Sequence, residues 1–122
     1  MKFKEVAFTA YPVTDMARAR AFYEGVLGLS ASRTFGKEPV WVEYDIGPGC
    51  LAIMAGSDES WRPASAGPAA ALEVDDFDGA VAKLRAAGVK FLGEPTEYPP
   101  CRMVIAHDPD GNRIAIHHRK AG

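Results

Sequence analysis

Hydrophobic and polar positions along this chain form two similar blocks. Phe8–Met16 and Ala69–Phe77 each read as a short strand that ends in Val-x-Asp followed by an apolar residue. After each strand, apolar residues recur at near-helical spacing. These positions are Met16, Ala19, Phe22, Tyr23 and Val26 in the first block and Phe77, Ala80, Val81, Leu84 and Ala87 in the second. We therefore expect a strand and then a helix in each block, with Phe22 and Leu84 buried.

Both predicted helices carry residues that mark their ends. Asp15 and Asp76 stand just before the helices, where a carboxylate accepts hydrogen bonds from exposed N–H groups. Gly28 and Gly88 suit the left-handed turn at which a helix commonly ends. The sequence thus predicts capped helices that stop before the next strand.

Further strands follow each helix. The segments with strand character are Leu29–Phe35, Val40–Ile46 and Cys50–Met54 in the first block and Val89–Leu92, Arg102–His107 and Arg113–His118 in the second. Between the last two segments, Asp108 and Asp110 belong to an Asp-Pro-Asp-Gly-Asn run that predicts a tight turn. Each block therefore reads βαβββ. Residues 56–68 are rich in Ser, Gly, Pro and Ala and read as a linker.

The strongest strand pattern, Val40–Ile46, alternates strictly, so its two faces differ in chemistry. We expect the even-numbered side chains to pack under the helices. Trp41, Glu43 and Asp45 then point to the other face of the sheet. There, Trp41 offers a large stacking surface for a ligand; the alternative is a tryptophan of the core or of a dimer interface.

Composition narrows the class of protein. The chain has 122 residues, 14 Lys+Arg against 16 Asp+Glu, and a formal net charge of −2, which is typical of one globular domain. It has no basic cluster for nucleic acid and no apolar run long enough to span a membrane. Cys50 and Cys101 lack metal-type spacing, and no secretion signal is apparent, so we expect a reduced, cytoplasmic protein.

Two segments carry a resemblance to a known family. Val13–Leu29 (VTDMARARAFYEGVLGL) resembles the first-helix signature of the vicinal oxygen chelate superfamily, the glyoxalase/bleomycin resistance/dioxygenase-like proteins. His107–His117 (HDPDGNRIAIH) resembles the hairpin of that superfamily's second module. The resemblance implies an α+β fold of two βαβββ modules, about residues 3–55 and 69–118 of a single domain. Their curled mixed sheet surrounds a cleft, helices lie on the convex side, and the protein is a homodimer.

The enzymes of this superfamily hold a divalent metal in the cleft, through His, Glu or Gln on the first and last strand of each module. The positions that match those ligands here are Phe8, Ala69, Ala115 and either Ala52 or Ile53. None of these side chains has an atom that binds a metal. We therefore predict no metal at the usual site, no cofactor, and an apolar floor that suits a small organic molecule.

The predicted ligand-binding set combines strand parity with the resemblance. Its members are Phe8, Trp41, Glu43, Ala69, Ala115 and His117. Glu43 and His117 are also the catalytic candidates, because a carboxylate on a half-apolar wall has a raised pKa and an imidazole titrates near neutral pH. Glu43 could equally pair with Arg33 or Arg102.

Several other residues favour a structural interpretation. We expect Glu73 to form a salt bridge near the end of its sheet and Cys101 to be an inert buried thiol. His107 is expected to hydrogen-bond close to its turn. Trp61 lies in the linker, where it either covers the cleft or packs on a partner subunit.

Two functional classes remain open. The first is a metal-free binding protein of the bleomycin-resistance type, which holds a small organic molecule, for example an aromatic one. The second is a metal-dependent lyase or isomerase of the glyoxalase type, or a dioxygenase-like enzyme. Its relocated ligands would be Glu43, His107 and His117. The sequence favours the first class and names no ligand.

Overall fold

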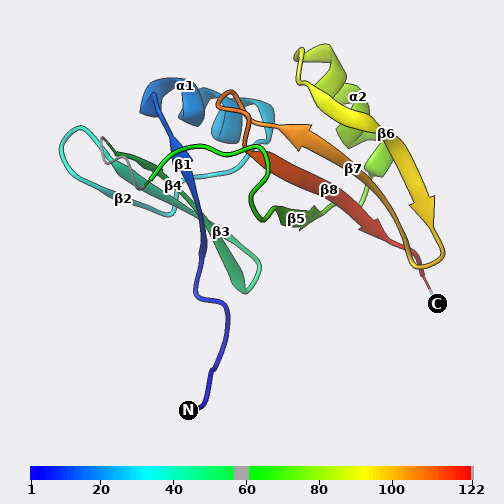
Figure 1. Ribbon diagram of the computed structural model, residues 1–122, viewed down its shortest axis with the longest axis horizontal. Helices are drawn as coiled ribbons and strands as arrows, with labels where there is room; N and C mark the ends of the chain where they lie inside the picture. Colours follow the sequence, from blue (N-terminus) through cyan, green and yellow to red (C-terminus); the bar gives the residue numbers. More distant parts are fainter. Residues whose placement is uncertain (57–60, 122) are drawn as a thin grey trace. The chain divides into compact units, whose positions relative to one another are not determined.

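The computed structural model describes residues 1–56 and 61–121, and the chain divides into two compact units, Met1–Pro63 and Ala64–Gly122 (Figure 1). Part of the predicted linker, residues 57–60, lies outside the described residues. No helix in the described part of the chain is both long enough and apolar enough to cross a membrane.

The first unit is a four-stranded sheet with one helical segment. Its elements are β1 (Thr9–Val13), α1 (Met16–Arg20), the π-helix η1 (Ala21–Val26), β2 (Arg33–Phe35), β3 (Trp41–Ile46) and β4 (Gly49–Ala55). The strand order is β1-β4-β3-β2, with β1 parallel to β4 and the other pairs antiparallel. The first eight residues form no strand and lead away from the sheet (Figure 1).

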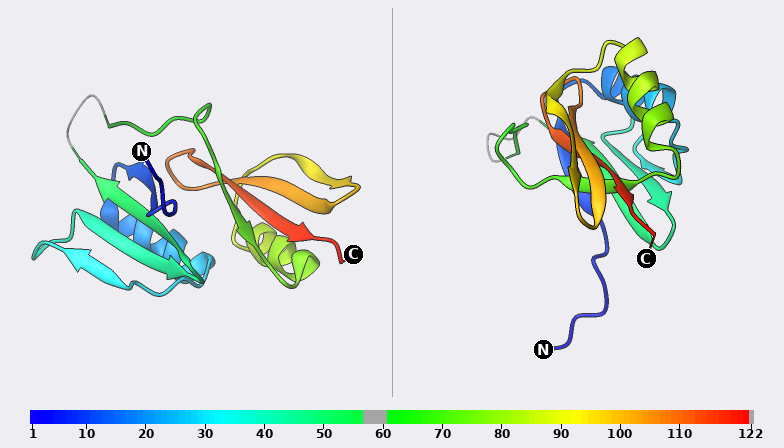
Figure 2. Two further views of the ribbon diagram at one scale, coloured as in Figure 1. Left: turned by 90° about the horizontal axis from the view of Figure 1, so that it is seen from below. Right: turned by 90° about the vertical axis from the view of Figure 1, so that its right-hand side faces the viewer.

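The second unit repeats this plan. Its elements are β5 (Ala70–Glu73), α2 (Phe77–Ala86), β6 (Phe91–Tyr98), β7 (Cys101–His107) and β8 (Arg113–Arg119). The order β5-β8-β7-β6 matches that of the first sheet strand for strand, and β5 is again parallel to its neighbour β8. Figure 2 shows α2 along one face of this sheet. The predicted pair of βαβββ modules, and with it the α+β class, is confirmed.

The predicted helix ends are confirmed in both units. The Asp15 carboxylate accepts a hydrogen bond from the backbone N–H of Arg18, and Asp76 accepts one from Gly79, both at 3.0 Å. Gly28 and Gly88 adopt φ values of 75° and 76°. This left-handed conformation ends each helix, and glycine adopts it without the strain that a side chain would cause.

The core of the first unit lies between the helical segment and the sheet. Val42 and Tyr44 are fully buried, and so is Tyr23 of the helical segment, while its neighbour Phe22 is 6% exposed. The Tyr23 and Tyr44 rings stack with centroids 6.0 Å apart. Even-numbered residues of β3 therefore face the helix, as predicted, and odd-numbered residues face the opposite side.

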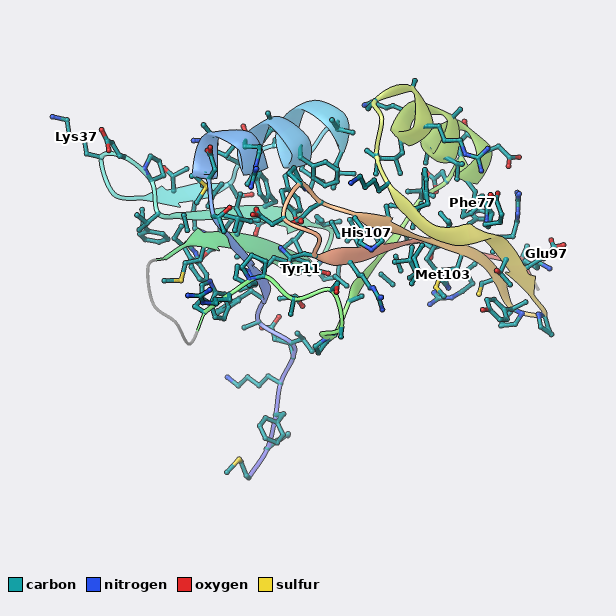
Figure 3. The ribbon with its side chains drawn as sticks, turned by 45° about the horizontal axis from the view of Figure 1, so that its top comes forward. Tyr11, Lys37, Phe77, Glu97, Met103 and His107 are labelled. Atoms are coloured by element: carbon teal, nitrogen blue, oxygen red, sulfur yellow. The ribbon has the colours of Figure 1, made fainter. Side chains whose placement is uncertain are left out.

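The second unit has the same layering. Phe77 and Leu84 of α2 are buried, together with Ile114 and Ile116 of β8. In Figure 3, Phe77 lies on the α2 side of the sheet and Met103 on the other side. The predicted burial of Phe22 and Leu84 is confirmed, because each one is central to the apolar stripe of its helix.

Two strands differ from their predicted extents by more than one residue at an end. β2 begins at Arg33 rather than Leu29, and β6 runs from Phe91 to Tyr98 although Val89–Leu92 was the predicted segment. β6 contains Gly93 and Pro95, which argue against a strand from sequence alone. It tolerates them because it is the edge strand of its sheet and its register with β7 shifts between Leu92 and Thr96.

Candidate functional site

The helix covers one face of the first sheet; the other is here called the helix-free face. Polar and aromatic side chains lie on it in rows. In one row, Trp41 of β3 stands between Phe35 of β2 and Met54 of β4. In the next, Glu43 stands between Arg33 and Ala52. Directly opposed residues of a sheet project to the same side, so each row lies on one surface.

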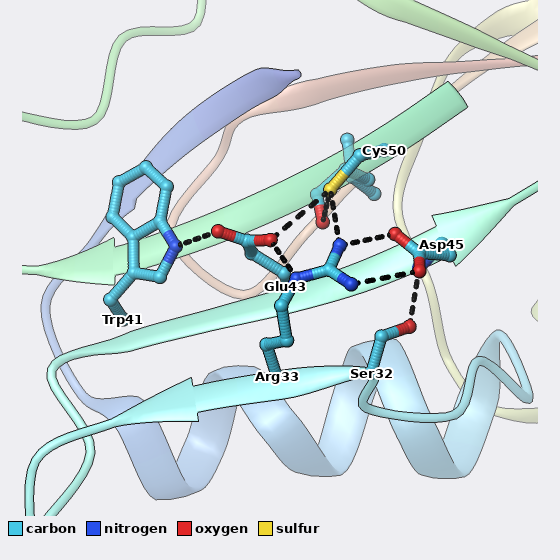
Figure 4. Close-up of polar contacts among 7 residues, drawn as sticks. Ser32, Arg33, Trp41, Glu43, Asp45 and Cys50 are labelled. Atoms are coloured by element: carbon cyan, nitrogen blue, oxygen red, sulfur yellow. Dashed lines mark hydrogen bonds and ion pairs between the residues drawn. The ribbon is translucent and has the colours of Figure 1, made fainter. Parts of the chain in front are cut away.

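A charged cluster of Arg33, Glu43 and Asp45 occupies this face (Figure 4). Arg33 donates from Nε to Glu43 Oε1 at 2.5 Å, and from Nη1 and Nη2 to the two oxygens of Asp45 at 3.1 and 2.5 Å. Trp41 donates its indole N–H to Glu43 Oε2 at 2.7 Å. One guanidinium thus holds two carboxylates, and Glu43 joins the cluster to the tryptophan.

The electrostatics of the cluster contradict one sequence prediction. The hydrogen bond from Arg33, followed by that from Trp41, lowers the pKa of Glu43 below its usual value. The Arg33 bond likewise lowers the pKa of Asp45. The expectation of a raised Glu43 pKa was wrong, because the cationic partner outweighs the half-apolar wall. Since a general base works best with a pKa near the operating pH, Glu43 is poorly suited to that role.

Aromatic side chains border the cluster. Phe8 meets Trp41 edge to face, with ring centroids 5.2 Å apart. Phe8 and Phe35 remain 48% and 54% exposed, which is high for phenylalanine. The structure therefore brings together three of the predicted ligand-binding residues, Phe8, Trp41 and Glu43.

The register also settles which β4 residue matches the fourth metal-ligand position. Ala52 pairs with Ala10 of β1 and Glu43 of β3 on the helix-free face. Ile53 pairs with Tyr11 and Val42 on the buried side. Ala52 is thus the equivalent residue, and its methyl group cannot bind a metal.

Cys50 lies at the edge of the cluster, a residue that the sequence did not single out there. Its Sγ is 3.9 Å from Glu43 Oε1 and 4.0 Å from Arg33 Nη2. Burial, with a contribution from Glu43, raises the pKa of this thiol. Cys50 is therefore a poor nucleophile. Both cysteines are free; Cys101 is half-buried rather than buried as expected.

On the second sheet, His117 and Glu73 form a pair. His117 Nδ1 is 2.5 Å from Glu73 Oε1, and the backbone N–H of Arg119 donates to Glu73 Oε2 at 2.6 Å. The Arg119 bond, followed by His117, lowers the pKa of Glu73. Glu73 thus has structural partners near the end of its sheet, as predicted, and its contact with His117 is an ion pair when the imidazole is protonated. Ala115 is buried on the same side of β8 as His117, and Ala69 is exposed just before β5.

Two of the three relocated metal-ligand candidates, His107 and His117, lie on neighbouring strands of the second sheet. His107 is opposite Arg113, and His117 lies four residues further along β8, a separation of about 13 Å at the usual rise of a strand. Among residues 1–56 and 61–121, no three His, Cys, Asp or Glu side chains are grouped to hold a metal.

Three remaining candidates have structural contacts. Trp61 donates its indole N–H to the Met54 carbonyl at 3.3 Å. His107 Nδ1 lies 3.2 Å from the carbonyl of Lys90, which directly precedes β6. The partner of His107 is therefore outside the turn next to which it was predicted to bond. The Asp108 carboxylate accepts from the backbone N–H groups of Asp110 and Asn112, both at 2.9 Å, which confirms the predicted turn chemistry.

Comparison with known sequences matches nearly the whole chain to one family. The family model described as Glyoxalase/Bleomycin resistance protein/Dioxygenase superfamily matches residues 5–116. Among curated proteins, YetH of Bacillus subtilis (strain 168) is 28% identical over 120 residues, covering 89% of this chain and 93% of YetH.

Solved structures agree with this match. TnmS3, an antibiotic binding protein from Streptomyces sp. CB03234, superposes with a TM-score of 0.80 at 25% identity, covering 98% of this chain and 99% of TnmS3. A glyoxalase/bleomycin resistance protein from the same organism gives 0.74 at 25% identity, over 95% of this chain and 100% of that one.

Proposed function

The chain belongs to the glyoxalase/bleomycin resistance protein/dioxygenase superfamily, and from that premise we propose that it binds a small organic molecule on the helix-free face of its first sheet without a metal ion. One observation carries the proposal. Trp41 joins an exposed aromatic edge, Phe8, to a charged carboxylate, Glu43. Such a surface offers stacking area and fixed polar contacts together, the combination typical of small-molecule sites.

The four residues that match the metal ligands of the family's enzymes support a site without metal. Phe8 and three alanines, Ala52, Ala69 and Ala115, stand where the family's enzymes carry their ligands. These side chains offer no oxygen, nitrogen or sulfur atom to a cation. The nearest carboxylate on the first sheet, Glu43, is bound to Arg33 and Trp41. A metal would have to displace both partners.

The similarity to TnmS3 supports a binding protein rather than an enzyme. TnmS3 is an antibiotic binding protein, and it shares 25% of its residues with this chain across almost the full length of both. The lowered pKa of Glu43 removes the general base that an enzyme on this face would use. A protein that sequesters a flat organic molecule needs only the surface that Trp41 provides.

The two tryptophans provide a matched test. Trp41→Ala removes the stacking surface and should weaken binding of an aromatic ligand about tenfold or more, because aromatic contacts contribute about 0.5–1.5 kcal/mol beyond the burial of their area. Trp61→Ala removes the same kind of side chain from the residues that follow β4, where its indole N–H bonds the Met54 carbonyl, and should weaken binding less than Trp41→Ala does.

The measurement is an equilibrium titration of an aromatic probe, such as an anthraquinone or a naphthalene derivative, followed by intrinsic fluorescence or calorimetry. Circular dichroism of each variant controls for loss of folding. Equal affinities for the parent protein and Trp41→Ala, with a probe that binds at one site, would rule out this face as the binding site.

A further inference from the structure

The strongest hydrogen-bond donors of the charged cluster point at its own carboxylates. The Arg33 guanidinium directs Nε to Glu43 and both terminal nitrogens to Asp45. The Trp41 indole N–H points to the other Glu43 oxygen. An anionic ligand needs donors of this kind. Beside Arg33 and Trp41 it would also lie next to Glu43 and Asp45, whose negative charges repel an anion.

Hydrogen-bond acceptors, in contrast, are more numerous than this cluster's own donors require. Two carboxylates face one guanidinium, so the cluster carries a net charge of one negative. An ionised carboxylate has about four lone-pair sites, and each Glu43 oxygen receives one short bond from Arg33 or Trp41. The lowered pKa values of Glu43 and Asp45 keep both groups ionised at neutral pH. The face therefore offers charge and lone pairs to a group that donates.

The aromatic rings favour the same kind of ligand. Since the indole N–H of Trp41 is used by Glu43, the ring contributes its π-system. Phe8, just before β1, meets the Trp41 ring edge to face, and Phe35 lies opposite Trp41 on β2, so both add exposed rings. The faces of aromatic rings attract cations, Trp most strongly. Carboxylates and rings side by side form a surface that is both anionic and aromatic.

We infer that the helix-free face of the first sheet selects positively charged organic molecules, such as aromatic ammonium compounds, over neutral or anionic molecules of the same shape. The inference rests on the proposed function and adds the charge of the ligand to it. The cationic group donates to Glu43 or Asp45, and the flat part of the ligand packs on Trp41. Arg33 orients the two carboxylates and offsets part of their mutual repulsion.

Three probes that share one ring system separate charge from shape. They are 1-naphthylmethylammonium, 1-naphthylmethanol and 1-naphthoate, titrated at pH 7.5 by calorimetry. A charge-assisted hydrogen bond together with a cation–π contact predicts that the ammonium compound binds on the order of tenfold more tightly than the alcohol. The carboxylate should bind most weakly.

A pair of charge-matched variants locates the selectivity. Glu43→Gln cancels the excess negative charge with little change of shape and should reduce the preference for the ammonium compound to about threefold or less. Glu38→Gln removes the same charge from the exposed turn between β2 and β3 and should leave the preference unchanged. If Glu43→Gln does not fold, Asp45→Asn serves the same purpose on the other side of Arg33.

The possible outcomes separate the two proposals. Binding of the alcohol or the carboxylate as tightly as the ammonium compound overturns this inference and leaves the proposed function standing. An ammonium preference that survives both Glu43→Gln and Asp45→Asn also overturns it, because the charge would then come from elsewhere. Failure of all three probes to bind contradicts the proposed function itself.

Discussion

At the scale of single residues, Arg33 determines the chemistry of the first sheet. It sits on the short edge strand β2, opposite Glu43, with about half of its side chain exposed. Its guanidinium bridges Glu43 and Asp45, which stand two residues apart on β3. The same contacts lower the pKa of both carboxyl groups, so one side chain changes Glu43 from a candidate base into a fixed anion.

Removal of Arg33 should therefore raise the pKa of Glu43. In Arg33→Gln, the first cause of the lowered value is lost and only the weaker Trp41 bond remains, so the Glu43 pKa should return toward its ordinary value of about 4.3. Carboxyl carbon chemical shifts, followed by NMR as a function of pH, measure this directly. Arg85→Gln, which breaks the exposed Arg85–Glu94 pair of the second unit, is the matched control and should not move Glu43.

The same shift has a consequence for stability. A carboxyl whose folded-state pKa is lowered stabilises the fold above its unfolded-state pKa and loses that contribution as the pH falls through the folded value. The parent protein should therefore lose more stability than Arg33→Gln as the pH falls below the ordinary carboxyl pKa of about 4. Parallel acid-unfolding curves for the two proteins would contradict this explanation.

Sequence reasoning placed Trp41 and Glu43 on one face because strand parity is a local property. It also named Arg33 as one of two possible partners of Glu43, and could not choose between Arg33 and Arg102. That choice depends on which strands are neighbours: Arg33 lies opposite Glu43, whereas Arg102 bonds Asp78 and covers the Phe77 ring. Phe35 and Asp45 were missed as site residues for the same reason. Two signals could have identified them: Phe35 lies opposite Trp41, and Asp45 has the same strand parity as Glu43.

At the scale of elements, the helices were the most predictable parts of the chain. Their apolar spacing and their Asp and Gly ends lie within one short segment, so local sequence determines them. β6 was the least predictable strand, since its Gly93 and Pro95 are acceptable only on an unpaired edge. The edge position of β6 in its sheet permits these two residues, and that position cannot be read from the local sequence.

The two helical glycines provide a test of the capping account. A Cβ at Gly79 would lie 2.3 Å from Asp76 Oδ2, so Gly79→Ala forces the capping carboxylate away from the helix start. A Cβ at Gly25 would meet nothing within 4 Å. Gly25→Ala should raise the free energy of unfolding by about 0.5–1 kcal/mol.

Gly79→Ala, in contrast, loses a cap that contributes about 1 kcal/mol and should show no such gain. Urea unfolding of the two variants compares them directly, and we expect their stabilities to differ by about 1 kcal/mol. An equal gain in both variants would show that the Asp76 carboxylate contributes little to the start of α2.

At the scale of the whole molecule, one backbone plan carries two sets of side chains. Both sheets have the same strand order and the same parallel first pair. The helix-free face of the first presents Trp41 and the Arg33 cluster, whereas that of the second presents the Glu73–His117 pair and Met103. The repeat was visible in the sequence because backbone requirements are similar in both blocks. The predicted single cleft that would contain Phe8, Trp41, Glu43 and His117 stays a prediction.

The central claim is that a small organic molecule binds at Trp41 without a metal ion. The most direct measurement is an NMR titration of ¹⁵N-labelled protein, stripped of metal by a chelator, with 1-naphthylmethylammonium. The account predicts that the indole N–H signal of Trp41 and the Nε–H signal of Arg33 shift and saturate together, and that the indole signal of Trp61 moves less. Binding that leaves the Trp41 signal unmoved, or that appears only after a divalent metal is restored, would contradict the account.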